Sequence, residues 1–336
     1  MVSITRLKKI LDGIPKIKIA VVGDFFLDKI LHIDRSLDEP SLETGLTAYQ
    51  VTGVLPSPGA AGTVTNNLSA LGVGEISAIG AIGDDGEGYD LIKKLRATGV
   101  DTEGIIRDGG LFTPTYTKPM FGGLEETHRL DIRNRGVFPK GIEARLIERV
   151  YEASKKVDAI IALDQVVERN TGVITDAMRD ALAAIGRERP ELLIFADSRA
   201  HIGLFRNIVI KCNHNEVSGG GGAATEEGLK ARALEMSAES GRDVFVTWGE
   251  RGIIAAGGGE VAHVPAAKVE PPIDICGAGD AATAGTVSAL CCGAARAEAA
   301  FVGNLAAGVT IKKIGVTGTA SRDEIIALYH EHGYTR

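Results

Sequence analysis

The chain has few cysteines, no long apolar run and no excess of basic residues, and each shortage excludes a class of protein. Four cysteines occur in 336 residues, none with the spacing of a disulfide framework or a Cys/His metal site, so we expect small buried thiols in a reducing compartment. No apolar run approaches the roughly 18 residues that cross a bilayer, which excludes a membrane-spanning role. The amino terminus lacks the continuous apolar stretch of a secretory signal, so we expect a cytoplasmic location.

The charge balance and the missing nucleotide-binding motifs exclude further functions. A formal net charge of -7 argues against broad nucleic-acid binding, which depends on a basic surface, so any phosphate site must be local. No Walker A loop or protein-kinase glycine loop is present. The run VVGDFF lacks the Gly-x-Gly-x-x-Gly turn of a dinucleotide site, which argues against a nicotinamide-dependent oxidoreductase.

What the chain does contain is an alternation of aliphatic runs with helical patterns. The runs are typical of strands buried on both faces, and they lie at residues 18–24, 158–164, 192–197, 207–211 and 243–249. Apolar residues at helical spacing lie between them, as in Val64, Leu68 and Leu71. The alternation predicts an α/β fold with a doubly wound, mainly parallel sheet and helices on both faces, in a single domain over residues 1–336. Ligands of such sheets bind beyond the carboxyl ends of the strands.

Two segments interrupt the alternation, at residues about 28–57 and about 111–135. The first is polar and β-branched, and the second has the pattern of a hairpin around Gly122 and Gly123. We expect them to form a small antiparallel sheet that acts as a lid over the cleft; the alternative is an edge extension of the main sheet. The glycine-rich run at 218–224 lacks the Lys and Ser/Thr of a phosphate loop, so we expect a mobile connector there.

The main chemical signal is the turn Gly277-Ala278-Gly279-Asp280, which leads into an alanine-rich helix. Small side chains let a phosphate approach the backbone, and the unpaired N–H groups and dipole of a helix start stabilise negative charge. Asp280 falls in the first turn, where a carboxylate can accept the proton of an attacking hydroxyl. The alternative is an ordinary helix start with an acidic residue favoured by the dipole, and this segment alone supports both interpretations equally.

Nearly the whole chain resembles the ribokinase/PfkB family of carbohydrate kinases, which favours phosphoryl transfer. Asp274 and the turn after it match the family's DTxGAGD signature, with Ile275 in place of the threonine. The resemblance implies a ribokinase-like fold, ATP as the phosphoryl donor and Mg2+ as a cofactor. It also implies that Asp280 is the catalytic base and that the anion hole consists of Gly277, Ala278 and Gly279.

The resemblance assigns further residues to the nucleotide side of the cleft. Asn213 and Glu216 have the family's Asn-x-x-Glu spacing after a strand, and Glu216 would help to hold Mg2+ through its water shell. By itself this spacing is that of an ordinary helix start. The other matching positions on this side are Thr247, Gly249, Gly252, Asn304 and Arg199.

The substrate side departs more from the family pattern. Asp28 matches the aspartate that binds sugar hydroxyls, a task that suits a carboxylate because it can accept two hydrogen bonds at once. A Gly-Gly pair and an asparagine of the family are replaced, so the sugar can differ from that of typical members; these positions are Gly59, Ala60 and Thr63. Within the family, the likeness is strongest to the heptose 7-phosphate kinases of lipopolysaccharide precursor synthesis. A phosphate on the sugar would need cations, for which the candidates are Lys118, Arg129 and Arg133; the alternative for these three is a solvated face of the hairpin.

The sequence therefore predicts an ATP-dependent kinase of a sugar or sugar phosphate. The runner-up is a non-catalytic nucleotide or sugar sensor on the same fold, which the retained Asp280 argues against. By resemblance we expect a homodimer formed through the lid strands, and no nucleic-acid or membrane partner. The chain ends soon after the region of resemblance, so no adenylyltransferase domain is expected within it.

Overall fold

The structure is a computed structural model that describes residues 2–122, 125–126, 128–217 and 225–333. The predicted connector at 218–224 and Gly123 of the predicted hairpin lie outside the described residues. No helix among the described residues has the length and apolar character needed to cross a bilayer.

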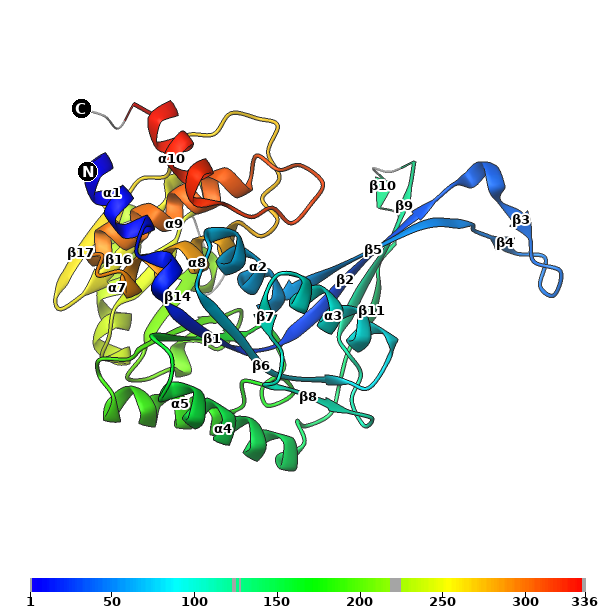
Figure 1. Ribbon diagram of the computed structural model, residues 1–336, viewed down its shortest axis with the longest axis horizontal. Coiled ribbons are helices and arrows are strands. Elements are labelled where there is room, and N and C mark those ends of the chain that lie inside the picture. Colours follow the sequence, from blue (N-terminus) through cyan, green and yellow to red (C-terminus); the bar gives the residue numbers. More distant parts are fainter. Residues whose placement is uncertain (1, 123–124, 127, 218–224, 334–336) are drawn as a thin grey trace.

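A ten-stranded sheet forms the centre of the molecule, in the order β17-β16-β15-β14-β13-β12-β1-β6-β7, with β8 also paired to β6 (Figure 1). All neighbours from β7 to β15 pair in parallel, whereas β16 and β17 add an antiparallel edge. The strands are β1 (Lys18–Gly23), β6 (Glu75–Gly83), β7 (Val100–Asp101), β8 (Ile105–Asp108), β12 (Ala159–Asp164), β13 (Leu193–Ser198), β14 (Val209–Asn213), β15 (Val244–Thr247), β16 (Ile253–Gly257) and β17 (Glu260–Val264). The five predicted runs are β1, β12, β13, β14 and β15, so the mainly parallel sheet is confirmed.

Helices cover both faces of this sheet because its strands are apolar on both sides. In β1, Ile19 and Val21 belong to one buried cluster, and Ala20 and Val22 belong to the cluster on the opposite face. Helices α2, α8 and α9 supply the first cluster, and α4, α5 and α7 supply the second. The helices are α1 (Ile4–Leu11), α2 (Ala61–Leu71), α3 (Gly86–Ala97), α4 (Lys140–Ser154), α5 (Asp176–Glu188), α6 (His214–Val217), α7 (Glu226–Ser240), α8 (Ala278–Cys291), α9 (Arg296–Thr310) and α10 (Arg322–Glu331).

The two interrupting segments form a separate five-stranded sheet, so the edge-extension alternative is wrong. This lid sheet projects from the body as a long ribbon (Figure 1). The expectation of a purely antiparallel lid is also wrong, because β2 and β9 pair in parallel. The connection between the two segments contains α2, β6, α3, β7 and β8, and a crossover of this length can return the chain so that β9 runs in the same direction as β2. The lid strands are β2 (Phe25–Ile33), β5 (Val51–Ala60), β9 (Thr115–Phe121), β10 (Glu125–Glu126) and β11 (Leu130–Ile132), and the tip of the ribbon is β3 (Glu39–Pro40) and β4 (Thr47–Ala48).

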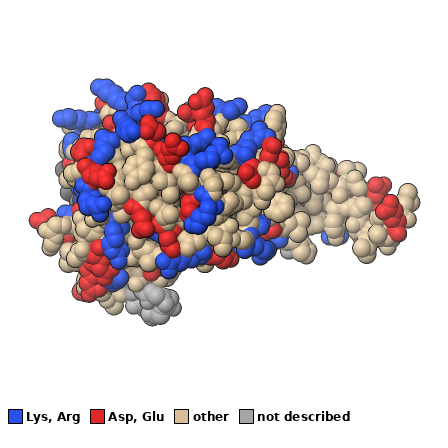
Figure 2. Space-filling model, turned by 90° about the horizontal axis from the view of Figure 1, so that it is seen from below, with Lys and Arg blue, Asp and Glu red and all other residues tan. Residues whose placement is uncertain are grey.

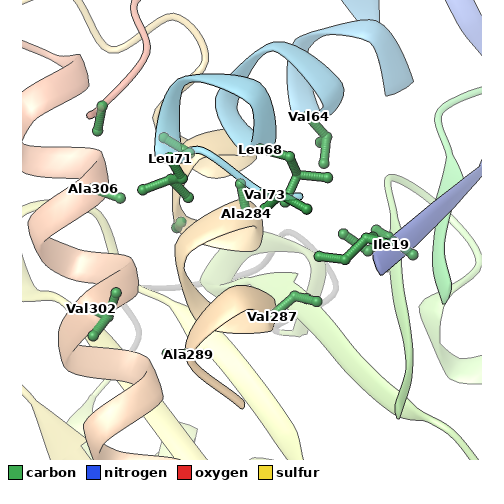
Figure 3. Packing of buried hydrophobic residues seen from close by; sticks show 14 of the residues in the cluster. Ile19, Val64, Leu68, Leu71, Val73, Ala284, Val287, Ala289, Val302 and Ala306 are labelled. Atoms are coloured by element: carbon green, nitrogen blue, oxygen red, sulfur yellow. The ribbon is translucent and has the colours of Figure 1, made fainter. Parts of the chain in front are cut away.

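Packing of α2 on α8 joins the amino-terminal and carboxy-terminal halves of the chain. Figure 3 shows Val64 and Leu68 of α2 close to Ala284 and Val287 of α8, and all four side chains are fully buried. The small side chains of α8 allow this close approach, which explains its alanine-rich sequence. The starts of the two helices are thereby held at the same place in the molecule.

Candidate active site

The Gly277–Asp280 turn lies at the start of α8, as predicted. Gly277 precedes the helix with φ +78°, and a Cβ there would lie 2.8 Å from a neighbouring side chain, so both backbone and space require glycine. Ala278 donates its N–H to the carbonyl oxygen of Ile275 at 3.2 Å. For the N–H groups of Gly279 and Asp280, no backbone acceptor exists in the described part of the chain. These two groups, rather than the engaged N–H of Ala278, are the donors available to an anion.

Asp280 is a half-buried carboxylate whose pKa suits a base at neutral pH. Burial, together with the charges of Asp197 and Asp28, raises its pKa to about 7, against the opposing effect of the charges of Lys211 and Arg199. A group with a pKa near the working pH can both accept and release a proton. The position combines such a group with two free N–H donors in one helical turn.

Asp28 lies in β2 of the lid sheet, close enough for its charge to act on Asp280. Its carboxylate packs over Gly59 on β5, where a Cβ would come within 2.5 Å of Asp28 Oδ2, so any larger residue there would displace the acid. Burial raises the Asp28 pKa, and the charges of Lys118 and Arg129 lower it. Because the Asp28 charge raises the pKa of Asp280, the two predicted carboxylates lie within electrostatic range across the cleft.

Thr63 and Ala60 link the two halves of the site. The Thr63 methyl lies 3.6 Å from the Cβ position of Gly277, so the starts of α2 and α8 adjoin. The Thr63 hydroxyl is buried and donates to the carbonyl oxygen of Pro58 at 3.4 Å, which turns it toward the backbone. Ala60 has φ 53° and ψ -119°, a conformation that normally requires glycine. Ala60 thus adopts a glycine-like backbone conformation at the position where the family resemblance has a second glycine.

The Ala60→Gly variant should be more stable than the parent by about 1 kcal/mol, because relief of the strained backbone outweighs the larger unfolded-state entropy of glycine. Urea unfolding should show a higher midpoint at an unchanged slope. Ala61→Gly is the matched control: it lies in the first turn of α2, is fully buried and should be destabilising. If both variants lose stability alike, Ala60 is not strained.

Asn213 and Glu216 form a reciprocal cap at the start of α6. Asn213 Oδ1 accepts the Glu216 N–H at 3.1 Å, and Glu216 Oε2 accepts the Asn213 N–H at 2.6 Å. These two hydrogen bonds are the geometry of an ordinary helix start, which was the alternative interpretation of the Asn-x-x-Glu spacing. Burial raises the pKa of Glu216, and the charges of Lys211 and Arg199 lower it, so the carboxylate shares these two cations with Asp280.

The remaining predicted nucleotide residues divide into two groups. Thr247 closes β15, and Gly249 and Gly252 form the positive-φ turn that follows it. Asn304 is buried in α9, and its side-chain amide donates to the carbonyl oxygens of Val264 and Pro265 at 2.8 and 3.2 Å. In this structure Asn304 ties α9 to the end of β17, a role that the sequence did not predict.

Basic residues of the lid cluster around Tyr116. The guanidinium groups of Arg129 and Arg133 lie 4.8 and 5.3 Å from its ring centre, and both pair with Asp131. The Lys118 ammonium lies 3.8 Å from Glu126. Figure 1 shows β9 and β11 side by side, and Leu130 to Ile132 of β11 pair antiparallel with β9, which brings these cations together.

A cavity beside this cluster is lined by Arg199, which the family resemblance assigned to the nucleotide side. Arg199, which follows β13, lines the cavity together with Tyr116, Arg133, Asn134 and Gln165. No carboxylate pairs with the exposed Arg199 guanidinium within the described residues. Two acids also line the cavity, Glu168 and Asp24, and Asp24 accepts backbone N–H groups of residues 165, 166 and 173. The charge of Arg199 also acts on Asp280, so this cavity lies near the start of α8.

Lys211, which the sequence analysis did not single out, lies beside the first turn of α8, with its Nζ 3.4 Å from the Cβ position of Gly279. It lies in β14 directly before the Asn213 turn, and its ammonium forms a buried ion pair with Asp197 at 2.7 Å. The available signal was a lysine at the end of an otherwise aliphatic strand run, which is unusual for a strand buried on both faces.

No preformed metal cage exists among the described residues, since no group of three or more His, Cys, Asp or Glu is arranged to hold an ion. Mg2+ keeps several waters and is commonly bound by one or two carboxylates together with substrate phosphates. The half-buried Glu216 fits that mode of binding. The donor set therefore suits Mg2+ that arrives with a nucleotide.

Two unpaired N–H groups at a helix start, with a carboxylate of near-neutral pKa beside them on a doubly wound α/β fold, define a phosphotransferase with an alcohol acceptor. The profile described as pfkB family carbohydrate kinase matches residues 16–123 and 207–323, more than half of the chain. The chain therefore belongs to the pfkB family of carbohydrate kinases.

Curated relatives include bifunctional HldE proteins. The HldE of Citrifermentans bemidjiense is 29% identical over 322 residues, covering 93% of this chain and 63% of that protein. The HldE of Trichlorobacter lovleyi is 29% identical over 321 residues, covering 93% of this chain and 62% of that protein. The chain thus spans less than two thirds of the length of these relatives.

Solved structures share the fold at low sequence identity. Phosphofructokinase-2 from Escherichia coli, in complex with substrates and products, has a TM-score of 0.72 at 16% identity, covering 94% of this chain and 99% of that one. Ribokinase from Arabidopsis thaliana, complexed with ribose and ATP, has a TM-score of 0.69 at 16% identity, covering 93% and 98%. An E. coli structure in complex with ATP and Mg2+ has a TM-score of 0.68 at 18% identity, covering 94% and 99%. The predicted ribokinase-like fold is thereby confirmed.

Proposed function

We propose that this kinase transfers the γ-phosphoryl group of ATP to a hydroxyl of a sugar that already carries a phosphate, with heptose 7-phosphate as the first candidate. The observation that carries the proposal is the cavity lined by Arg133 and Arg199, because the Arg199 charge also acts on Asp280. Similarity to HldE proteins supports a heptose phosphate as the acceptor. A sugar could then occupy the cleft while its phosphate occupies the cavity.

Asp28 and Asp280 would act on opposite ends of the acceptor. Asp28, held over Gly59, accepts hydrogen bonds from sugar hydroxyls and sets their orientation. Asp280 accepts the proton of the attacking hydroxyl as the new O–P bond forms and the bond to the ADP oxygen breaks. The N–H groups of Gly279 and Asp280 stabilise the charge on the transferring phosphoryl group. The lid sheet excludes water that would otherwise accept the phosphate.

The nucleotide would lie against the turn after β15, with its phosphates directed toward α8. Glu216 would hold Mg2+ through water, and the ion would neutralise charge on the nucleotide phosphates. Thr247, Gly249 and Gly252 would line the phosphates and ribose. Glu216 and Asp280 lie in range of the same two cations, Lys211 and Arg199, so the carboxylate that would hold Mg2+ and the proposed base belong to one site.

The cavity is suited to a phosphate because of its charge and hydrogen-bonding groups. Arg133 and Arg199 supply guanidinium groups and Gln165 supplies an amide donor, whereas the Asn134 amide already donates to the carbonyl oxygen of Phe112. The backbone N–H groups bound to Asp24 reduce the repulsion that its carboxylate exerts on an anion. Glu168 is then the opposing charge in the lining, against two arginines.

ADP release measured with a panel of sugars and sugar phosphates tests this function. Turnover should be greatest with a phosphorylated sugar, and heptose 7-phosphate should exceed ribose and fructose. Turnover with free sugars only would reject the sugar-phosphate proposal. Nucleotide binding without turnover on any acceptor would favour a sensor.

We also propose that two copies of the chain pair through the lid ribbon. Figure 2 shows few charged side chains along the ribbon apart from an acidic group at its tip. Exposed apolar side chains occur along it, namely Leu37, Leu42, Leu46, Val51, Val54 and Leu55. No further strand pairs with the outer edge of β5 within the described residues, so its backbone groups can meet a second copy.

Light scattering after size exclusion should therefore give a mass of two chains. A double variant, Leu42→Asp with Leu46→Lys, should give a single chain, because both side chains are highly exposed on the ribbon. Ile314→Lys, an exposed apolar position away from the ribbon, should leave the dimer intact. A monomeric parent protein would reject the pairing.

A further inference from the structure

Lys211 and Asp197 form an ion pair that is buried at the carboxyl end of the main sheet. Each residue is only 7% exposed, and the Lys211 Nζ to Asp197 Oδ2 distance is 2.7 Å. A buried ion pair contributes little net stability, because the loss of hydration offsets the attraction between the charges. Stability therefore gives no sufficient reason to place a lysine here.

The pair is attached directly to the anion hole. A Cβ at Gly279 would lie 3.4 Å from Lys211 Nζ, so the ammonium adjoins the backbone whose N–H group is free. The Thr283 hydroxyl donates to Asp197 Oδ2 at 3.0 Å and lies 3.1 Å from the carbonyl oxygen of Gly279. The ion pair and the first turn of α8 are thus held as one unit.

The charges around Lys211 keep it protonated. Burial acts to lower its pKa, but Asp197, Asp280 and Glu216 together raise it above the ordinary value. At Asp280, the facing carboxylates are Asp197 and Asp28, and the facing cations are Lys211 and Arg199. A nucleotide that brings several negative charges into this group of acids needs a fixed cation beside the hole.

We propose that Lys211 is a further phosphate-binding residue of this site: its ammonium, fixed by Asp197, lies against the anion hole at Gly279 and binds the terminal phosphate of the nucleotide. The inference rests on the proposed function, because it requires ATP in this cleft. It predicts that Lys211 distinguishes a triphosphate from a diphosphate. A purely structural lysine would not do so.

Calorimetric titration with the Mg2+ complexes of β,γ-methylene-ATP and ADP tests the inference without any acceptor sugar. Lys211→Met should weaken binding of the triphosphate analogue by about 10- to 100-fold and leave ADP binding unchanged. Equal weakening of both nucleotides, or of neither, would overturn the inference. With a working acceptor, the same variant should lower kcat by about 10²-fold.

Two further variants test the inference if Lys211→Met folds poorly. Asp197→Asn retains the ammonium, and Lys211→Met combined with Asp197→Asn removes both charges of the pair. The preference for the triphosphate should persist in the first variant and disappear in the second. Persistence in both would overturn the inference.

Arg179→Met is the matched structural control. It breaks a comparably buried ion pair, in which Arg179 Nη1 lies 3.2 Å from Asp164 Oδ2. Neither residue of this pair belongs to the first turn of α8. Its unfolding temperature should fall while the nucleotide preference stays unchanged. If the parent protein binds neither nucleotide, the proposed function fails and this inference fails with it. If the parent binds both and the double variant keeps its preference, only the role of Lys211 is rejected.

Discussion

The Asp280→Asn variant should lower kcat by about 10³-fold, near the upper range for general acid–base catalysis, while leaving ATP affinity almost unchanged. An amide cannot accept the proton of the attacking hydroxyl, but it preserves the shape of the first turn of α8. Initial rates of ADP release and calorimetric ATP binding measure the two quantities.

Asp323→Asn is the control for this variant. Asp323 is an exposed carboxylate in the first turn of α10, so it has the helix-start position of Asp280 without the cleft. Its substitution should leave kcat unchanged. If Asp280→Asn retains most of the activity, Asp280 is an ordinary helix-start acid and the proposed base is wrong.

The pH dependence of kcat/KM should reflect the same carboxylate. Burial raises the Asp280 pKa to about 7, and only the ionised form accepts a proton. Activity should therefore be constant above about pH 7 and fall about tenfold per pH unit below it. A flat profile between pH 5 and 8 would contradict the assignment.

The stability of the folded protein should decrease as the pH rises, in the opposite direction to the activity. The folded-state pKa of Asp280 exceeds the ordinary value, so the folded protein binds this proton more tightly than the unfolded chain does. Its contribution to stability is present at low pH and is lost as the pH rises through about 7. Asp280→Asn should therefore unfold at a higher temperature than the parent at pH 8, which also demonstrates that the inactive variant is folded.

The parts of the fold that depend on local pattern were predictable from the sequence. Strands buried on both faces must be continuously apolar, so residues 18–24 and 158–164 could be recognised without any partner. The parallel pairing of β2 with β9 could not, because it depends on the path of the chain between two distant segments. The lid was thus predicted in extent and wrongly predicted in strand direction.

Within the site, side chains fixed by short spacing were easier to predict than those fixed by tertiary contacts. Gly277 and Asp280 lie in one helical turn, so their proximity follows from sequence alone. Asn304 carries no local sign that its amide would bind the backbone after β17. Lys211 meets Asp197 only because β14 pairs with β13, so its role depends on strand order.

Arg199→Ala should raise the KM for a phosphorylated sugar by about 10²-fold, with a smaller effect on the KM for ATP. The guanidinium lines the cavity with Arg133 and has no carboxylate partner among the described residues, so it is available to bind a phosphate through charge-assisted hydrogen bonds. Arg133→Ala should also raise the KM for the phosphorylated sugar, but by a smaller factor, because Arg133 also pairs with Asp131. Steady-state kinetics with each substrate varied in turn measure both constants.

The comparison between phosphorylated and free sugar decides which ligand Arg199 serves. The resemblance to the family assigns it to the nucleotide, and the cavity favours the acceptor, so the two assignments predict a rise in the KM of different substrates. Arg206→Ala is the control, since Arg206 lies in the same β13–β14 connection and donates instead to the carbonyl oxygens of Gly203 and Phe205. A rise in the KM for ATP alone would return Arg199 to the nucleotide side and leave the acceptor's phosphate to Lys118 and Arg129. A rise confined to the phosphorylated sugar would mean that the residue after β13 selects the acceptor, and that substrate choice depends on the main sheet as well as on the lid.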